Sequence, residues 1–151
     1  MMPANQNVIE MLQAAYSMEL ETVMNYLANS INLDGVRAEE IKKSLQADIT
    51  QELGHATQLG NRIKQVGGLV PGSLRVKLGN QTQPTENTTD VVGVIKAVIA
   101  AEEAACAQYR KIIKATEGED YVTQDLCIQL LGAEEEHLIL FQGFLKEYTQ
   151  P

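Results

Sequence analysis

The stretch GGLVPGSLRVKLGNQTQPTENTT, residues 67–89, separates two halves of the chain that otherwise show helical patterns. It contains two of the four prolines and few apolar residues after Leu78. Because glycines end helices and proline prevents their easy continuation, this stretch is expected to be an extended connection. It is too long for a tight turn between neighbouring helices, so it decides how the two halves are joined.

Four segments flanking this connection have the apolar spacing of amphipathic helices, and none alternates like a β-strand. The spacing predicts helices over residues 5–31, 36–66, 90–115 and 120–148. Short polar loops join the first helix to the second and the third to the fourth, so each pair is expected to be antiparallel. The predicted fold is all-α, a four-helix bundle of two antiparallel hairpins joined by one long crossover. Neither hairpin could bury its apolar residues alone, so residues 1–151 are expected to form a single domain.

The composition argues against several classes of protein. The 151 residues include 20 acidic and 12 basic side chains, for a formal net charge of −8, and only two histidines and two cysteines. A nucleic-acid-binding surface would need clustered basic residues, and a disulfide scaffold would need more cysteines. The apolar stretches are too short to cross a bilayer and the N-terminus lacks a signal-peptide pattern. A cytoplasmic location and no membrane partner are therefore expected.

Glutamates occupy the middle of each predicted helix at positions that should face the bundle core. Apolar residues recur every seven residues along these helices, the spacing typical of a helix that packs against other helices. One glutamate interrupts each series: Glu19, Glu52, Glu102 and Glu134. Four inward carboxylates without partners would repel one another and lose their hydration, so they require a compensating positive charge.

Both histidines of the chain follow one of these glutamates by three residues, in Glu52-Leu-Gly-His55 and Glu134-Glu-Glu-His137. On a helix this spacing places the carboxylate and the imidazole on one face, where both can bind the same ion. The two motifs are 82 residues apart, which makes them part of an internal repeat.

The repeat extends to two further residue types. Glu19 and Tyr26 recur 83 residues later as Glu102 and Tyr109. Four carboxylates and two imidazoles suit two divalent ions, because four negative charges balance two double positive charges. Oxygen-rich ligands with one nitrogen per ion favour iron or manganese over metals that thiolates select. A metal-free polar layer is the alternative, but these helical series contain no lysine or arginine to pair with the acids.

Neighbouring acids leave two alternatives open in the ligand set. Glu21 could replace Glu19, and Glu103 could replace Glu102, although neither precedes a tyrosine by seven residues. The two glutamates that follow Glu134 are expected to lie on the solvated face of their helix.

The ligand pattern resembles the ferritin-like superfamily, and within it the bacterioferritin type of di-metal centre. The resemblance covers nearly the whole chain and implies that Glu52 and Glu134 bridge two iron ions, with manganese as the alternative metal. The remaining ligands would each bind one ion: Glu19, His55, Glu102 and His137. The six residues would also be the catalytic groups, and Tyr26 and Tyr109 would contact the carboxylates.

The resemblance implies a ferroxidase that oxidises Fe(II) with dioxygen or hydrogen peroxide, stores the ferric product in a homo-oligomeric shell and protects against oxidative stress. Leu53 stands where bacterioferritins have a haem-binding methionine, so no haem is expected. The chain ends just after the fourth predicted helix, whereas shells of 24 subunits use a fifth. This favours a shell of 12 subunits, as in the Dps-like mini-ferritins.

Within the mini-ferritins, the pattern is most similar to the thioferritin group, which combines a bacterioferritin-type centre with nearby cysteines. Cys106 and Cys127 fall on the site faces of their helices and would be that redox pair.

Two other functions are alternatives to a ferroxidase. One is peroxide scavenging of the rubrerythrin or manganese-catalase kind. The other is a DNA-coating structural oligomer, against which the acidic balance and the lysine-free N-terminal tail both argue.

Overall fold

The computed structural model describes residues 5–150, which form four long α-helices and one short 3₁₀ turn. The helices are α1 (Gln6–Asn32), α2 (Glu39–Gln65), α3 (Val91–Thr116) and α4 (Tyr121–Thr149), and the turn η1 spans Val36–Ala38. No β-strand occurs in this range, and the predicted all-α four-helix bundle is confirmed. Residues 1–4 and 151, which the expected single domain includes, lie outside the described part of the chain. None of the four helices has the length and hydropathy needed to cross a membrane.

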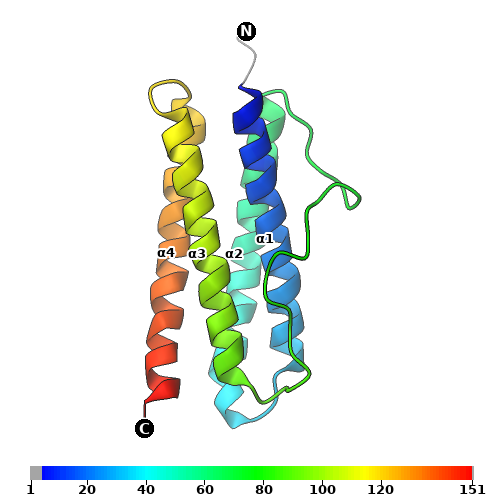
Figure 1. The fold of residues 1–151 in the computed structure, drawn as a ribbon, viewed down its shortest axis with the longest axis vertical. Helices are drawn as coiled ribbons and strands as arrows, with labels where there is room; N and C mark the ends of the chain where they lie inside the picture. Colours follow the sequence, from blue (N-terminus) through cyan, green and yellow to red (C-terminus); the bar gives the residue numbers. More distant parts are fainter. Residues whose placement is uncertain (1–4, 151) are drawn as a thin grey trace.

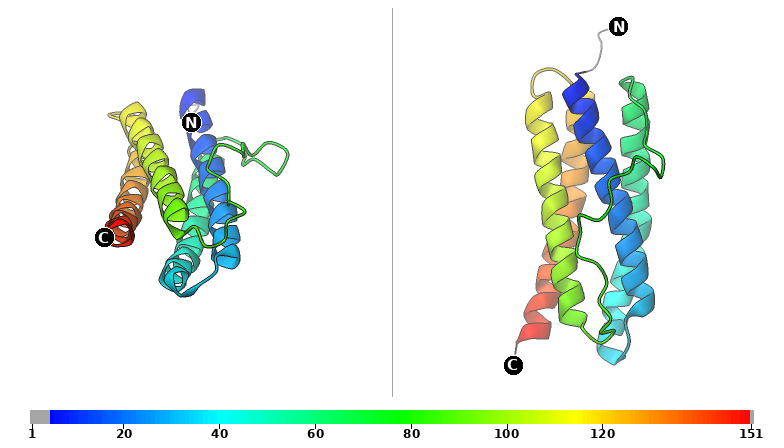
Figure 2. Two further views of the ribbon diagram at one scale, coloured as in Figure 1. Left: turned by 60° about the horizontal axis from the view of Figure 1, so that its bottom comes forward. Right: turned by 45° about the vertical axis from the view of Figure 1, so that its right-hand side comes forward.

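The four helices are arranged as two antiparallel hairpins, α1 with α2 and α3 with α4 (Figure 1). The hairpins pack against each other through α1 and α3 and, over a smaller area, through α2 and α4. Residues 66–90 run along the outside of α1 from one end of the bundle to the other (Figure 2). This long crossover makes α2 and α3 run in the same direction, and it is the connection that residues 67–89 predict.

Local hydrogen bonds explain where the helices begin. The side chains of Asn5, Asp90 and Asp120 cap α1, α3 and α4 by accepting a hydrogen bond from a backbone N–H in the first turn. Such caps satisfy N–H groups that have no partner within the helix. Helix α2 begins at Glu39 rather than at the expected residue 36, because Gly35, at φ 98°, leads first into the turn η1.

Two apolar clusters fill the bundle, one on each side of a polar middle layer. The first includes Leu12, Leu59, Ile112 and Leu130. The second includes Ile41, Leu45, Ile95 and Phe141. The polar layer between them contains six residues that are at most 7% exposed: Glu19, Glu52, His55, Glu102, Glu134 and His137. The apolar clusters hold the four helices together at both ends and so fix the spacing of the polar side chains between them.

Glu21 fastens the crossover to α1. Its buried carboxylate accepts hydrogen bonds from the backbone N–H groups of Gly79, Asn80 and Gln81, at 3.0–3.2 Å. The side-chain amide of Gln81 donates in turn to the hydroxyl of Thr22, at 2.8 Å. The crossover is therefore bound to the bundle by partly buried hydrogen bonds.

We expect Glu21→Ala to lower the free energy of unfolding by about 1–3 kcal/mol, because three backbone N–H groups lose their acceptor. The crossover should also become more sensitive to proteolysis. Chemical denaturation followed by circular dichroism, together with limited proteolysis, measures both effects. Glu10→Ala changes an exposed glutamate of the same helix and should stay within about 0.5 kcal/mol of the wild type. Equal behaviour of the two variants would contradict the anchoring role of Glu21.

Candidate metal centre

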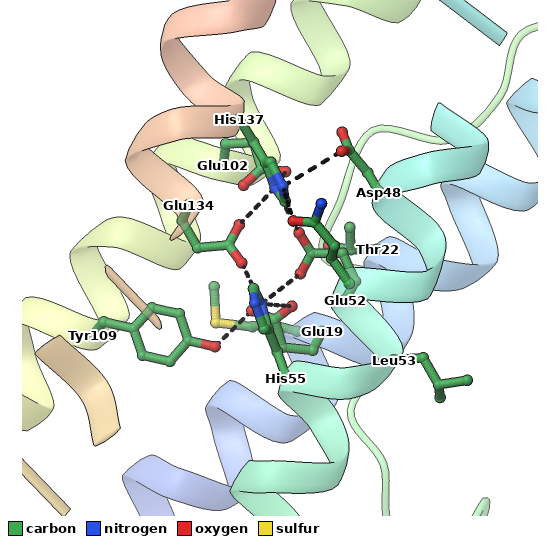
Figure 3. A network of polar contacts seen from close by, with 12 residues as sticks. Glu19, Thr22, Asp48, Glu52, Leu53, His55, Glu102, Tyr109, Glu134 and His137 are labelled. Carbon is green, nitrogen blue, oxygen red and sulfur yellow. Dashed lines mark hydrogen bonds and ion pairs between the residues drawn. The ribbon is translucent and has the colours of Figure 1, made fainter. Parts of the chain in front are cut away.

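All four helices contribute side chains to the polar layer, where four glutamates and both histidines point toward one another (Figure 3). Their potential ligand atoms form two groups, and within each group all atoms lie within 4.8 Å of one another. The first group, here the Glu19–His55 position, comprises Glu19, Glu52, His55 and Glu134. The second group, here the Glu102–His137 position, comprises Glu52, Glu102, Glu134 and His137. Two carboxylates belong to both groups, as expected of residues that bridge two ions.

The two positions have similar geometry. At the Glu19–His55 position, Nδ1 of His55 lies 2.7 Å from Glu134 Oε1. The same nitrogen lies 3.4 Å from Glu52 Oε2 and 3.6 Å from Glu19 Oε2. One ring nitrogen therefore faces three carboxylates.

At the Glu102–His137 position, Nδ1 of His137 lies 3.0 Å from Glu52 Oε1. It also lies 3.6 Å from Glu102 Oε1 and 3.8 Å from Glu134 Oε2. Again one imidazole nitrogen faces three carboxylates, and the different oxygens of Glu52 and Glu134 face the two positions.

The residues of the polar layer fit divalent ions. Among the described residues, three buried carboxylate oxygens of this layer have no hydrogen-bond partner: Oε2 of Glu19, of Glu52 and of Glu102. A buried carboxylate oxygen without a partner is costly, and a cation among these oxygens would remove that cost. Carboxylate oxygens with one imidazole nitrogen per position form a donor set that suits iron and manganese.

The buried carboxylates and imidazoles of the metal-free centre lie so close together that their pKa values are shifted. Burial by itself lowers the pKa of His55, but the carboxylates of Glu134 and Glu52 close to its ring outweigh the burial and raise the pKa to about 9. The pKa of His137 is raised as well, because the nearby carboxylates of Glu102, Glu134 and Glu52 outweigh its burial. Burial raises the pKa of Glu102 to about 8. Near pH 7, His55, His137 and Glu102 therefore each hold one additional proton in the metal-free centre. These three protons supply the positive charge that bound ions would otherwise supply.

Tyr26 and Tyr109 link the two hairpins at the centre. The hydroxyl of Tyr109 on α3 donates to Glu19 Oε1 at 2.6 Å, and that of Tyr26 on α1 donates to Glu102 Oε1 at 2.6 Å. Each hairpin thus supplies the tyrosine that orients a carboxylate of the other. Burial is the main cause that raises the pKa of both hydroxyls, so both stay neutral donors.

The alternative acids lie away from the two ion positions. The carboxylate of Glu21 binds the crossover, and Glu103 is exposed. Glu135, directly after Glu134, is exposed and lies 3.4 Å from Arg110. None of these three acids belongs to either group of potential ligands.

Cys106 and Cys127 are both buried and both free. Burial is the main cause that raises the pKa of the Cys106 thiol to about 11 and that of the Cys127 thiol to about 12. Both are protonated near neutral pH, whereas reactive cysteines have a lowered pKa. Their role as a redox pair stays a prediction.

Two further residues contact the centre although the sequence patterns did not indicate them. Nε2 of His137 lies 2.7 Å from Gln51 Oε1 and 3.4 Å from Asp48 Oδ1. Asp48 is only 4% exposed, and this burial raises its pKa to about 6. Its position one helical turn before Glu52 was an available signal, but the second hairpin has no acid at the corresponding place.

Leu53 lies next to a potential ligand but points away from the centre (Figure 3). Its side chain is half exposed on the outer surface of α2. The expectation that no haem binds here depends on the leucine at this place and stays a prediction.

Known proteins share this architecture. The family model of the ferritin-like domain matches residues 9–150. The chain is 30% identical over 138 residues to a bacterial ferritin of Neisseria meningitidis, which covers 90% of this chain and 84% of the relative. It is 27% identical over 145 residues to a DNA protection during starvation protein of Pyrococcus furiosus, which covers 93% of this chain and 77% of the relative.

A similar solved structure is that of a dodecameric thioferritin, the bacterioferritin-related protein of Bacteroides fragilis. The TM-score is 0.86 at 23% sequence identity, over 95% of this chain and 86% of that chain. At this identity the similarity establishes the fold. The resemblance that the ligand pattern predicts is confirmed, and the match over residues 9–150 shows that the chain belongs to the ferritin family of ferritin-like domains.

Proposed function

We propose that this protein is a ferroxidase that takes up two ferrous ions at the buried centre and passes the ferric product to a store. The observation that carries the proposal is that Glu52 and Glu134 belong to both groups of potential ligands. Shared carboxylates hold two ions close together, so that both can react with one oxidant molecule. Membership of the ferritin family supports the same function.

The protein groups would bind and orient the iron substrate. Glu19 and His55 complete one position, and Glu102 and His137 complete the other. The tyrosine hydroxyls hold one oxygen of Glu19 and one of Glu102, which leaves Oε2 of each free for an ion. The apolar clusters on both sides keep the centre buried and limit the access of water.

The electrons balance for either oxidant. Two ferrous ions supply one electron each. Hydrogen peroxide takes up these two electrons and two protons and becomes two water molecules, whereas dioxygen becomes hydrogen peroxide. A centre that holds two ions can therefore complete a two-electron reduction, and with hydrogen peroxide as the oxidant this reaction removes a partly reduced form of oxygen.

We also propose that copies of this chain assemble into a hollow shell of 12 subunits rather than 24. The similar thioferritin of Bacteroides fragilis is dodecameric, which supports this number. The net charge of −8 would help a shell to attract ferrous ions, and it argues against direct DNA contact.

Peroxide scavenging is the second candidate, because the same ligands suit manganese as well as iron. If the protein is a ferroxidase, we expect one hydrogen peroxide molecule to be consumed for every two ferrous ions added. The iron should also elute with the protein in size-exclusion chromatography. Peroxide electrode traces with metal analysis of the eluted protein measure both quantities. Continued breakdown of peroxide by the metal-loaded protein without further Fe(II), and no retained iron, would favour the scavenging function instead.

A further inference from the structure

The two halves of the centre differ at one buried position. The repeat that relates the two glutamate–histidine motifs places Leu130 where the first hairpin has Asp48, and Ala133 where it has Gln51. Asp48 and Leu130 are both almost fully buried, at 4% and 3% exposure. A carboxylate therefore stands behind one histidine at a place where the other half of the bundle has an aliphatic side chain.

This difference changes how the two imidazoles are held. Nε2 of His137 faces two acceptors, Gln51 Oε1 at 2.7 Å and Asp48 Oδ1 at 3.4 Å (Figure 3 shows the Asp48 contact). A neutral imidazole carries one N–H, and acceptors at Nε2 fix that hydrogen there, which leaves the lone pair of Nδ1 for an ion. Among residues 5–150, no side chain accepts a hydrogen bond from Nε2 of His55.

The difference also changes the charge around the two positions. Each position has the same ligand types, three carboxylates and one imidazole. The other buried acid nearby, Glu21, is already bound by the N–H groups of the crossover. Asp48 thus adds a negative charge on one side only, and its Oδ2 is buried without a partner.

We propose that Asp48, together with Gln51, makes the two ion positions unequal, so that the first divalent ion binds at the Glu102–His137 position. This inference rests on the proposed metal centre. Asp48 is a positioning residue that acts through His137. Partners behind ligating imidazoles change metal affinity by about 10- to 100-fold, so the first ion should bind that much more tightly than the second.

Titration of the metal-free assembly with Co(II), followed by visible absorption and calorimetry, tests the inequality. The wild type should bind two Co(II) per chain in two resolved steps. Glu102→Gln should remove the tighter step, and Glu19→Gln the weaker one. Asp48→Leu, which copies the residue of the other half, should weaken the tighter step about 10- to 100-fold so that the two steps merge.

The spectrum separates a positioning role from a general structural one. In Asp48→Leu, the visible spectrum of the ion at the Glu102–His137 position should change, while that of the other ion should not. Asp48→Asn keeps the shape and one acceptor, so it tests the charge even where the leucine variant does not fold. Glu40→Gln removes an exposed charge from the same helix and should leave both steps unchanged.

Each result bears on a different claim. Two Co(II) ions that bind the wild type with equal affinity would overturn the inequality. Wild-type titration curves for both Asp48→Leu and Asp48→Asn would overturn the role of Asp48, and either result would leave the metal centre standing. Binding of fewer than two Co(II) per chain at saturation would overturn the centre, and the inequality with it.

Discussion

Glu134→Gln should lower the initial rate of iron oxidation by at least about 100-fold while leaving the fold and the assembly unchanged. Glu134 is shared by both groups of potential ligands, so its loss weakens both ion positions at once. Losing a group that only supports a ligand already costs about 10- to 100-fold in metal affinity, and a shared ligand should cost more. Gln has nearly the same volume as Glu, so the packing of α4 should survive.

Stopped-flow absorbance of the ferric product after mixing with Fe(II) and peroxide measures this rate. Glu135→Gln is the matched control, because it removes the same charge from the next residue of the same helix, which is exposed. The control should react at the wild-type rate. Rapid oxidation by an intact Glu134→Gln protein would contradict the assignment of the site.

The combined affinity for two divalent ions should rise about 1,000-fold between pH 6 and pH 7. In the metal-free centre the pKa of His55 is raised to about 9 and that of Glu102 to about 8, and the pKa of His137 is raised as well. All three groups are protonated in this pH range and must lose their protons to bind ions. Three protons released for two ions give a slope of about three in the logarithm of the combined binding constant per pH unit.

The metal affinity should rise with pH because the pKa values of these three groups are raised. Lower pH favours the protonated groups and opposes metal binding, and the slope should decrease above about pH 8 as Glu102 loses its proton without help. Calorimetric Co(II) titrations in two buffers with different ionisation enthalpies count the released protons directly. Release of no protons at pH 6.5 would contradict the protonated state described for the metal-free centre.

The sequence was sufficient to predict the bundle and the six residues that the structure brings together. This was possible because the signals are local or periodic: Glu52 and His55 are neighbours on one helical face, and the same motif recurs 82 residues later. A glutamate within an apolar series of seven-residue spacing is also expected to be buried. Burying a carboxylate is unfavourable unless a positive charge or hydrogen bonds compensate for the lost hydration. The rarity of histidine made the signal clearer, because both histidines lie at the centre.

Contacts between distant parts of the chain could not be predicted in the same way. Asp48 and Gln51 support His137 from another helix, and no repeat in the second hairpin marks them. The sequence leaves Glu21 open as an alternative to Glu19, although no tyrosine follows it by seven residues, and in the structure its carboxylate binds the crossover instead. Such pairings depend on how the hairpins and the crossover pack, and local spacing carries no information about that packing.

The most direct test of the proposed centre is the number of ferrous ions that each chain oxidises rapidly. Metal-free protein is mixed anaerobically with increasing Fe(II) and then with peroxide, and the amplitude of the fast oxidation phase is recorded. We expect the amplitude to rise linearly and to break at two Fe(II) per chain, one for each position around Glu52 and Glu134. A break at one Fe(II) per chain, or no fast phase at all, would contradict a two-ion ferroxidase centre.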